Sequence, residues 1–394
     1  SYTCTIYRVA RRQALRGFTL IEMLVATTLL MILMLLIMYV FNGVSAIDSR
    51  TRAKVDAFRE ARAGFEAMTR QISQGMLNTY WDYYDTSGKS RVATNTAFVP
   101  NTYGRQSELH FVAGPTKFGT TPLLSAVATL QSVTHGIFFQ SPQGITNSSG
   151  VSANLPTLMN ASGYYIEYTS DLLDRPKFLQ SGTPLPPERW RFRLMEFVQG
   201  TENLQVYNTT KNSAASLGWF QTPLAITDPT KITLRSTRVV AENVIALVIL
   251  PHRSPNDVVP QGSLNQLAPK YYYNSRDYVA KPADTLALLT RNQLPPMVQV
   301  TMVVIDERSA ERLQNMITAP QTIANATNKL GLTTGLSGLF LQPSTQGDPA
   351  LGSVSEKDQY LLDLKALETQ LVALRLTYRI FSTDVSIMQA KWSE

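Results

Sequence analysis

The chain has 394 residues, enough for one large domain or two smaller ones with a buried core. Charged residues make up 16% of the sequence, below the usual quarter, and hydrophobic residues make up 44%. The formal net charge of +7 would suit nucleic-acid binding if the cations were clustered among aromatic residues. No such cluster follows the N-terminal segment, so nucleic acid is not expected as a partner.

Much of the basic charge lies in the first 17 residues. Arg8, Arg11, Arg12 and Arg16 precede a long hydrophobic run, and no acidic residue stands among them. Removing these four arginines lowers the net charge from +7 to +3. The single cysteine, Cys4, belongs to the same segment, so a chain without it could form neither disulfides nor thiolate metal sites.

Residues 18–41 are predicted to form a transmembrane helix. From Met23 to Phe41 the sequence has no charged residue, proline or glycine, over about the length that crosses ~30 Å of hydrocarbon. The preceding arginines predict a cytoplasmic N-terminus and a C-terminal body on the far side of the membrane. A secretory signal peptide fits poorly, because the apolar run is long and residues 39–43 make a poor cleavage site.

A plain signal anchor is the remaining alternative, and it does not account for Glu22. An ionisable side chain inside a membrane span costs roughly 2.5 kcal/mol or more unless it is paired. The sequence therefore points to a partner for this carboxylate.

Residues 16–22, Arg-Gly-Phe-Thr-Leu-Ile-Glu, resemble the signal of type IV pilins and type II secretion pseudopilins. The resemblance implies that 1–17 is a leader peptide, which a prepilin peptidase cuts off between Gly17 and Phe18 before the new N-terminal amine is methylated. It also implies that Glu22, fifth in the mature chain, assists assembly by pairing with the N-terminal amine of a neighbouring subunit. Such pairing offsets the desolvation of both charges.

Residues 42–78 are predicted to continue the helix as an amphipathic segment. Apolar residues recur at helical spacing, and the sequence has no proline before Pro100. Gly43 and Gly64 are places where the helix could bend. The apolar positions of this pattern are Val44, Ile47, Val55, Phe58, Phe65, Met68, Ile72 and Met76.

Residues 79–394 are predicted to form a globular head, so the fold class is α+β, with an antiparallel β-sheet packed on the amphipathic helix. Late helices are expected at Ser309–Met316 and Gln359–Leu374, with a flexible excursion over 318–357 that is rich in Thr, Gly and Ser. The expected strands are Leu109–Ala113, Gly136–Gln140, Tyr164–Tyr168, Arg191–Val198, Val239–Leu250, Met297–Ile305 and Leu376–Met388.

Segments of the head also resemble particular pilin-like groups. Residues 244–250 and 294–302 are similar to the C-terminal part of J-type pseudopilins and W-type minor pilins. Residues 306–310 and 378–393 are similar to the Verru_Chthon cassette protein C group. These resemblances imply a minor subunit of a type II secretion or type IV pilus-like filament. The long head favours a place near the tip, because a bulky domain is difficult to pack in a dense shaft. The subunit's partners would be other pilin-like subunits, an inner-membrane assembly platform and membrane lipid.

The sequence offers no catalytic, cofactor-binding or metal-binding motif. Its three histidines, His110, His135 and His252, lack the spacing of a metal site, and the first two are expected to be structural. Two aspartate pairs, Asp82/Asp85 and Asp171/Asp174, could hold calcium, although turns or solvated faces explain them better. We therefore expect a protein that is not an enzyme and has no cofactor.

Two aromatic runs, 80–84 and 271–273, fit either a contact surface or core packing. They leave open an alternative function, in which the pilin anchor delivers a surface adhesin or a DNA-uptake binding module.

Overall fold

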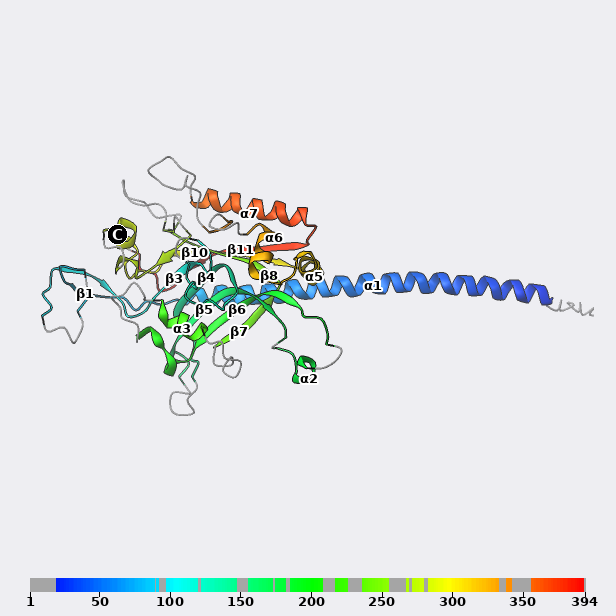
Figure 1. Cartoon of the computed structure of the whole chain (residues 1–394), viewed down its shortest axis with the longest axis horizontal. Coiled ribbons are helices and arrows are strands. Elements are labelled where there is room, and N and C mark those ends of the chain that lie inside the picture. Colours follow the sequence, from blue (N-terminus) through cyan, green and yellow to red (C-terminus); the bar gives the residue numbers. More distant parts are fainter. Residues whose placement is uncertain are drawn as a thin grey trace, which may run out of the picture. The chain divides into compact units, whose positions relative to one another are not determined.

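The structure is a computed structural model that describes residues 19–88, 90–91, 97–119, 122–146, 155–172, 174–181, 185–207, 217–225, 236–254, 267–268, 271–279, 283–332, 338–341 and 356–392 (Figure 1). The chain divides into two compact units, Ser1–Val55 and Asp56–Glu394. Helix α1 (Leu20–Ser73) begins in the first unit and ends in the second. The expected α+β class is confirmed: a long N-terminal helix is followed by antiparallel sheets and later helices.

In the first unit, Leu20–Ser45 is long and apolar enough to cross a membrane. At 1.5 Å per residue these 26 residues extend about 39 Å. Thr27 and Thr28 hydrogen-bond the carbonyls of Leu24 and Val25 at 3.0 and 2.9 Å. Both hydroxyls are therefore satisfied within the helix, as an apolar surrounding requires.

The second unit contains a six-stranded antiparallel sheet in the order β7-β6-β5-β4-β3-β9. Its core strands carry aromatic and β-branched residues and are buried along most of their length. The strands are β3 (Val112–Pro115), β4 (Ser132–Pro142), β5 (Met159–Ser170), β6 (Trp190–Gln199), β7 (Thr237–Glu242) and β9 (Tyr273–Asn274).

A second antiparallel sheet has the order β11-β10-β8, and a separate hairpin pairs β1 with β2. The strands are β8 (Val244–His252), β10 (Met297–Ile305), β11 (Tyr378–Ser386), β1 (Tyr80–Tyr84) and β2 (Thr102–Gln106). The helices of this unit are α2 (Lys177–Gln180), α3 (Gly218–Leu224), α4 (Thr285–Leu289), α5 (Glu307–Met316), α6 (Ile323–Leu330) and α7 (Glu356–Ala373). Short 3-10 turns lie at Thr201–Asn203, Gln205–Tyr207 and Asp277–Val279.

A β-bulge in β4 links the two sheets. The register with β5 shifts between Val133 and Gly136, which leaves Thr134 and His135 without a paired residue in β5. The Thr134 hydroxyl accepts the Leu247 N–H at 3.0 Å, and His135 Nδ1 accepts the Ile249 N–H at 3.0 Å. These side chains therefore satisfy N–H groups of β8, so both sheets belong to one core.

The C-terminal part of α1, from Asp56 to Ser73, is part of the core of the second unit. Phe58, Phe65, Met68 and Ile72 are at most 9% exposed, as the amphipathic pattern predicts. Phe65 packs against Phe381 of β11 with ring centroids 5.9 Å apart. The predicted stripe continues into the first unit, where Val44, Ile47 and Val55 are exposed.

Two sequence-based expectations need correction. The apolar run 239–250 is two strands, because Asn243 adopts a left-handed φ of 62° between β7 and β8, which belong to different sheets. Helix α6 lies inside the expected excursion 318–357, while 333–337 and 342–355 fall outside the described residues. Gly64 lies within the continuous helix α1 and allows close packing, because a Cβ atom there would lie 2.9 Å from Val240 Cγ1.

Candidate assembly site

Glu22 forms a capping box at the start of α1. Thr19 precedes the helix, and its hydroxyl oxygen accepts the Glu22 N–H at 3.3 Å. The Glu22 carboxylate oxygen Oε2 in return accepts the Thr19 N–H at 3.4 Å. This reciprocal pair satisfies two N–H groups of the first turn, and the negative charge also suits the positive end of the helix dipole.

The surface beyond this cap is apolar and uncovered. Side chains around the whole circumference of α1 are exposed from Leu20 to Val44, for example Leu35 at 65%. The predicted processing residues Gly17 and Phe18 lie outside the described residues. The structure therefore places Glu22 two residues into an exposed apolar helix and leaves the cleavage point to be tested by experiment.

Residues 13–38 match the family model of the prokaryotic N-terminal methylation motif. This match covers the predicted processing site, Glu22 and most of the apolar helix. A type IV pilin-like protein fits both observations. The motif indicates processing by a prepilin peptidase and assembly with other pilins, and the helix fits anchoring in a membrane. No curated protein and no solved structure matches the chain.

In the head, helix α5 is held against β6 through charged residues. Glu307, in the first turn of α5, accepts hydrogen bonds from Arg191 and Arg189 at 2.7 Å and from Asn243 at 2.8 Å. Burial alone would raise the pKa of Glu307, but these bonds outweigh it and lower the pKa to about 2. Because the Arg191 side chain is only 1% exposed, the Glu307 charge is the compensation for a buried cation.

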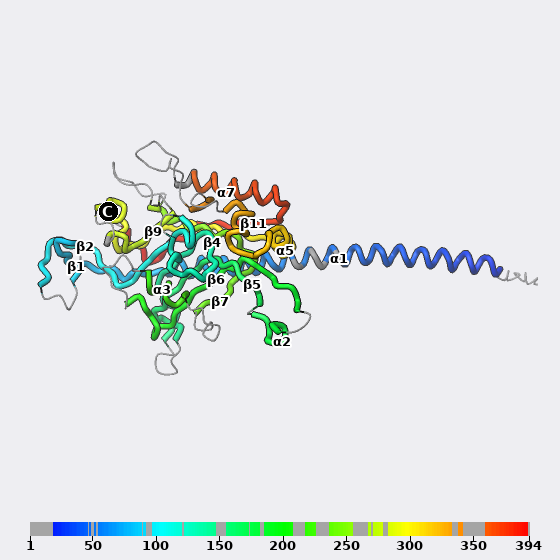
Figure 2. Tube along the Cα trace, in the orientation of Figure 1, coloured from blue at the N-terminus to red at the C-terminus, as the bar shows by residue number. Residues whose placement is uncertain are grey.

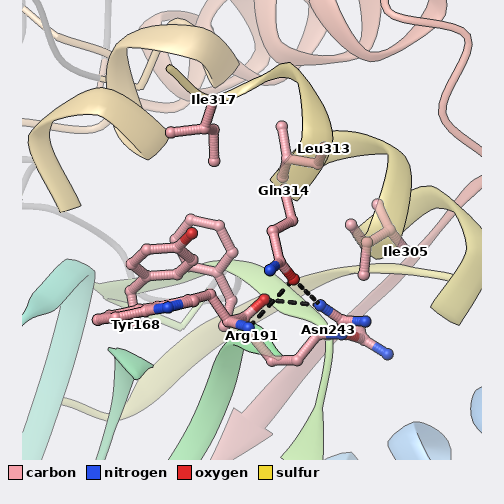
Figure 3. A pocket seen from close by; sticks show the side chains of 10 residues that line it. Tyr168, Arg191, Asn243, Ile305, Leu313, Gln314 and Ile317 are labelled. Carbon is pink, nitrogen blue, oxygen red and sulfur yellow. Dashed lines mark hydrogen bonds between the residues drawn. The ribbon is translucent and has the colours of Figure 1, made fainter. Parts of the chain in front are cut away.

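Arg191 and Asn243 also help to line a small pocket beside α5 (Figure 3). In Figure 3, Arg191 and Gln314 point toward one another, and their hydrogen bond is 2.7 Å long. The space amounts to about 220 Å³ including open solvent, below the range of ordinary ligand sites. We therefore interpret this cluster as the attachment of α5 and not as a binding site.

His110 and His135 serve structural roles. His110 Nδ1 accepts the Trp219 indole N–H at 3.1 Å, and its Nε2 faces Asn274 Oδ1 at 2.7 Å. His135 is completely buried at the bulge, whereas His252 is half-buried at the end of β8. The structural interpretation of His110 and His135 is thus confirmed.

The aspartates singled out for calcium have other partners. Asp171 pairs with Arg175 at 2.9 Å, and Asp174 pairs with Arg193 at 2.7 Å. Asp82 and Asp85 accept the N–H groups of Tyr83 and Ser87, both at 2.8 Å. Within the described ranges no three His, Cys, Asp or Glu side chains form a group that could hold a metal.

The two aromatic runs differ in their surroundings. Tyr271 and Tyr273 are at most 2% exposed and belong to the core. Trp81 and Tyr83 of β1 are 57% and 44% exposed, and Tyr103 of β2 is 60% exposed. The sequence left both explanations open for both runs. The structure assigns core packing to Tyr271 and Tyr273 of the second run, and in the first run it exposes Trp81 and Tyr83 and buries Tyr84.

Sequence reasoning missed the capping role of Glu22. The signal was present, because Thr19-Leu20-Ile21-Glu22 has the Thr-x-x-Glu pattern of a capping box before an apolar run. It also missed Glu307, whose importance depends on burial of Arg191, a residue more than a hundred positions away.

Proposed function

We propose that this chain is a minor pilin or pseudopilin subunit that polymerises with other pilin-like subunits into a filament. A prepilin peptidase cuts between Gly17 and Phe18, and the mature subunit waits in the inner membrane beside an assembly platform. The methylation motif and the uncovered apolar helix support this function. Four arginines before the span support a cytoplasmic N-terminus, with the head on the far side.

The proposal extends to a low-abundance, non-enzymatic subunit near the filament tip, in a type II secretion or type IV pilus-like system. The head of about 340 residues supports this position, because so large a domain is difficult to pack in a dense shaft. The similarities to J-type pseudopilins, W-type minor pilins and the Verru_Chthon cassette protein C group favour the same role.

The geometry of Glu22 is the observation that carries the proposal. Its Oε2 atom is used by Thr19, and none of the described residues hydrogen-bonds Oε1. A carboxylate can accept several hydrogen bonds, so the cap and the amine of a neighbouring subunit can be bound together. Pairing in the membrane would remove the penalty of an isolated charge there.

The test separates docking from capping by three substitutions. Glu22→Gln keeps a side chain that can cap the helix but removes the charge, and Thr19→Ala removes the cap but keeps the charge. Gly17→Glu addresses processing. We expect Gly17→Glu to leave the leader attached, Glu22→Gln to be processed without entering filaments, and Thr19→Ala to be processed and assembled.

The readouts are the mass of the N-terminal peptide and the amount of subunit in sheared filaments. Normal incorporation of the Glu22→Gln protein would rule out the docking role, because it would show that the charge is dispensable. A leader removed normally from the Gly17→Glu protein would rule out the predicted cleavage site.

A further inference from the structure

The β1–β2 hairpin presents three aromatic rings on one exposed face. Trp81 and Tyr83 are two positions apart in β1 and so lie on the same face, and Tyr103 of β2 lies directly opposite Tyr83. The Tyr103 ring centroid is 5.6 Å from that of Trp81 and 5.1 Å from that of Tyr83, so the rings form one continuous cluster. No described residue hydrogen-bonds the two tyrosine hydroxyls or the indole N–H.

The opposite face attaches the hairpin to the head. Tyr84 is fully buried and lies over Gly104, where a Cβ atom would come within 3.0 Å of its ring. The Arg291 guanidinium carbon lies 3.4 Å from the Tyr84 centroid and 4.6 Å from the Tyr278 centroid. An isolated two-stranded hairpin has only marginal stability in water. The contact of Arg291 with the rings of Tyr84 and Tyr278, which we call the Arg291 sandwich, therefore holds the three exposed rings in place.

The hairpin lies at one end of the second unit, and α2 and α5 lie at the other (Figure 2).

The composition of the hairpin narrows the class of partner. Its two strands read Tyr-Trp-Asp-Tyr-Tyr and Thr-Tyr-Gly-Arg-Gln, with one acidic and one basic residue and no aliphatic side chain. Single-stranded nucleic acid needs a basic groove beside its stacking rings. Arg105, the only cation of these strands, is half-buried, and in the segment that joins the strands the Arg91 guanidinium lies over the Phe98 ring, 5.5 Å from its centroid. Charge therefore disfavours nucleic acid.

The size of the ring face disfavours a protein partner. A stable protein interface uses about 20–30 residues and ~800 Å² on each side, more than the three exposed rings on one face of the two five-residue strands offer. A narrow, uncharged chain of sugar rings matches better. One face of a sugar ring is lined by C–H groups that stack on aromatic rings, and its hydroxyls can bond the free tyrosine hydroxyls and indole N–H.

We propose that Trp81, Tyr83 and Tyr103 form a binding surface for a neutral polysaccharide. This function is additional to filament assembly and does not depend on Glu22. The rings stack on successive sugar units, and the Arg291 sandwich holds the hairpin in the binding conformation. No bond is formed or broken.

The experiment is affinity electrophoresis of the full-length protein in detergent micelles. Native gels contain hydroxyethyl cellulose, xylan or galactomannan, and a plain gel gives the reference mobility. We expect at least one polysaccharide to slow the protein. Trp81→Ala and Tyr103→Ala should weaken the apparent affinity about tenfold, as expected when one stacked ring is lost.

Trp81→Phe keeps a ring and should retain most of the retardation. Phe178→Ala is the matched control, because it removes another exposed aromatic residue, 75% exposed on α2 at the other end of the unit. Among the four tryptophans Trp81 is the most exposed, so the polysaccharide should also shift the tryptophan emission of the wild type but not of Trp81→Phe.

Equal mobility in all gels would overturn the proposal, and so would retardation that Trp81→Ala leaves unchanged. Binding of a single-stranded oligonucleotide without binding of any of the polysaccharides would also overturn it, in favour of nucleic acid. The exposed positions of both alanine variants make folding defects easy to detect, by comparing their thermal unfolding with that of the wild type.

Discussion

The buried side chain of His135 makes a contact between β4 and β8 that depends on pH. Its Nδ1 accepts the Ile249 N–H, so the proton of the neutral ring is on Nε2, which donates to the Phe340 carbonyl at 2.6 Å. The 3.2 Å approach of Nδ1 to the Ile249 carbonyl is then a contact and not a hydrogen bond. Protonation would remove the acceptor for Ile249 and place a charge in the core.

Burial accordingly lowers the pKa of His135 from 6.5 to about 4, although the hydrogen bond that Nε2 donates to the Phe340 carbonyl opposes this shift. The unfolded chain therefore binds a proton below pH 6.5 that the folded chain does not bind until about pH 4. Stability falls as the pH decreases through this window. We expect a loss of about 2–3 kcal/mol in the free energy of unfolding between pH 7 and 4.5.

The measurement is urea unfolding of the full-length protein, followed by near-ultraviolet circular dichroism at several pH values. The free energy of unfolding of His135→Gln should be lower than that of the wild type at pH 7. It should also change less with pH above pH 4.5, where few carboxylates have begun to titrate. His252→Gln should keep the loss that depends on His135. Identical pH profiles for wild type and His135→Gln would contradict the assignment.

Among single residues, local contacts could be predicted from the sequence and long-range contacts could not. The Thr19–Glu22 cap is local and could be found from its spacing alone. The importance of Glu307 and His135 could not, because it depends on partners such as Arg191 and Phe340 that the fold brings from distant positions.

At the scale of elements, regular apolar patterns gave the most reliable predictions. The expected strand 297–305 coincides with β10, and the expected segments 136–140, 164–168 and 191–198 lie inside β4, β5 and β6. The continuous apolar run 239–250 concealed the turn at Asn243, because nothing in the pattern marks a change of sheet. Helix α6 had usable signals, since Thr322 caps its start and Gly331 ends it with a φ of 70°.

No periodic pattern in the sequence predicts the β1–β2 hairpin or the close contact of α1 with β7. Strand β1 carries aromatic residues on both faces and therefore lacks the alternation of a half-buried strand. Gly64 was expected as a point of bending, whereas its role in the fold depends on Val240 of β7.

Gly64 gives a prediction at the scale of these elements. A Cβ atom there would lie 2.9 Å from Val240 Cγ1 and 3.5 Å from Ala241 Cβ. Gly64→Val should therefore lower the free energy of unfolding of the head by about 1–3 kcal/mol, as overpacked cores do. Chemical unfolding measures the loss, and adding Val240→Ala to the variant should restore part of it. Gly43→Val is the control, because nothing lies within 4 Å of a Cβ atom at that position. Equal stability of the Gly64 and Gly43 variants would contradict close packing of α1 on β7.

At the scale of the whole molecule, the compact head includes the end of α1. The sequence places the start of the head at residue 79, after the amphipathic helix, whereas the compact second unit begins at Asp56. Between these points Phe58, Phe65, Met68 and Ile72 are buried in its core. Each such side chain contributes about 1.5–3 kcal/mol when buried, so the four together contribute roughly 6–12 kcal/mol.

That contribution is comparable with the whole stability of a typical domain, about 5–15 kcal/mol. A fragment of residues 79–394 should therefore fail to fold, because its two sheets would expose the surface that α1 covers, including Phe381 of β11. A fragment of residues 56–394 retains the helix without the membrane span and should unfold cooperatively on heating. Circular dichroism and limited proteolysis of the two fragments, expressed side by side, compare them. If the shorter fragment unfolded cooperatively at the same temperature as the longer one, the head would fold without residues 56–78, and the prediction would be wrong.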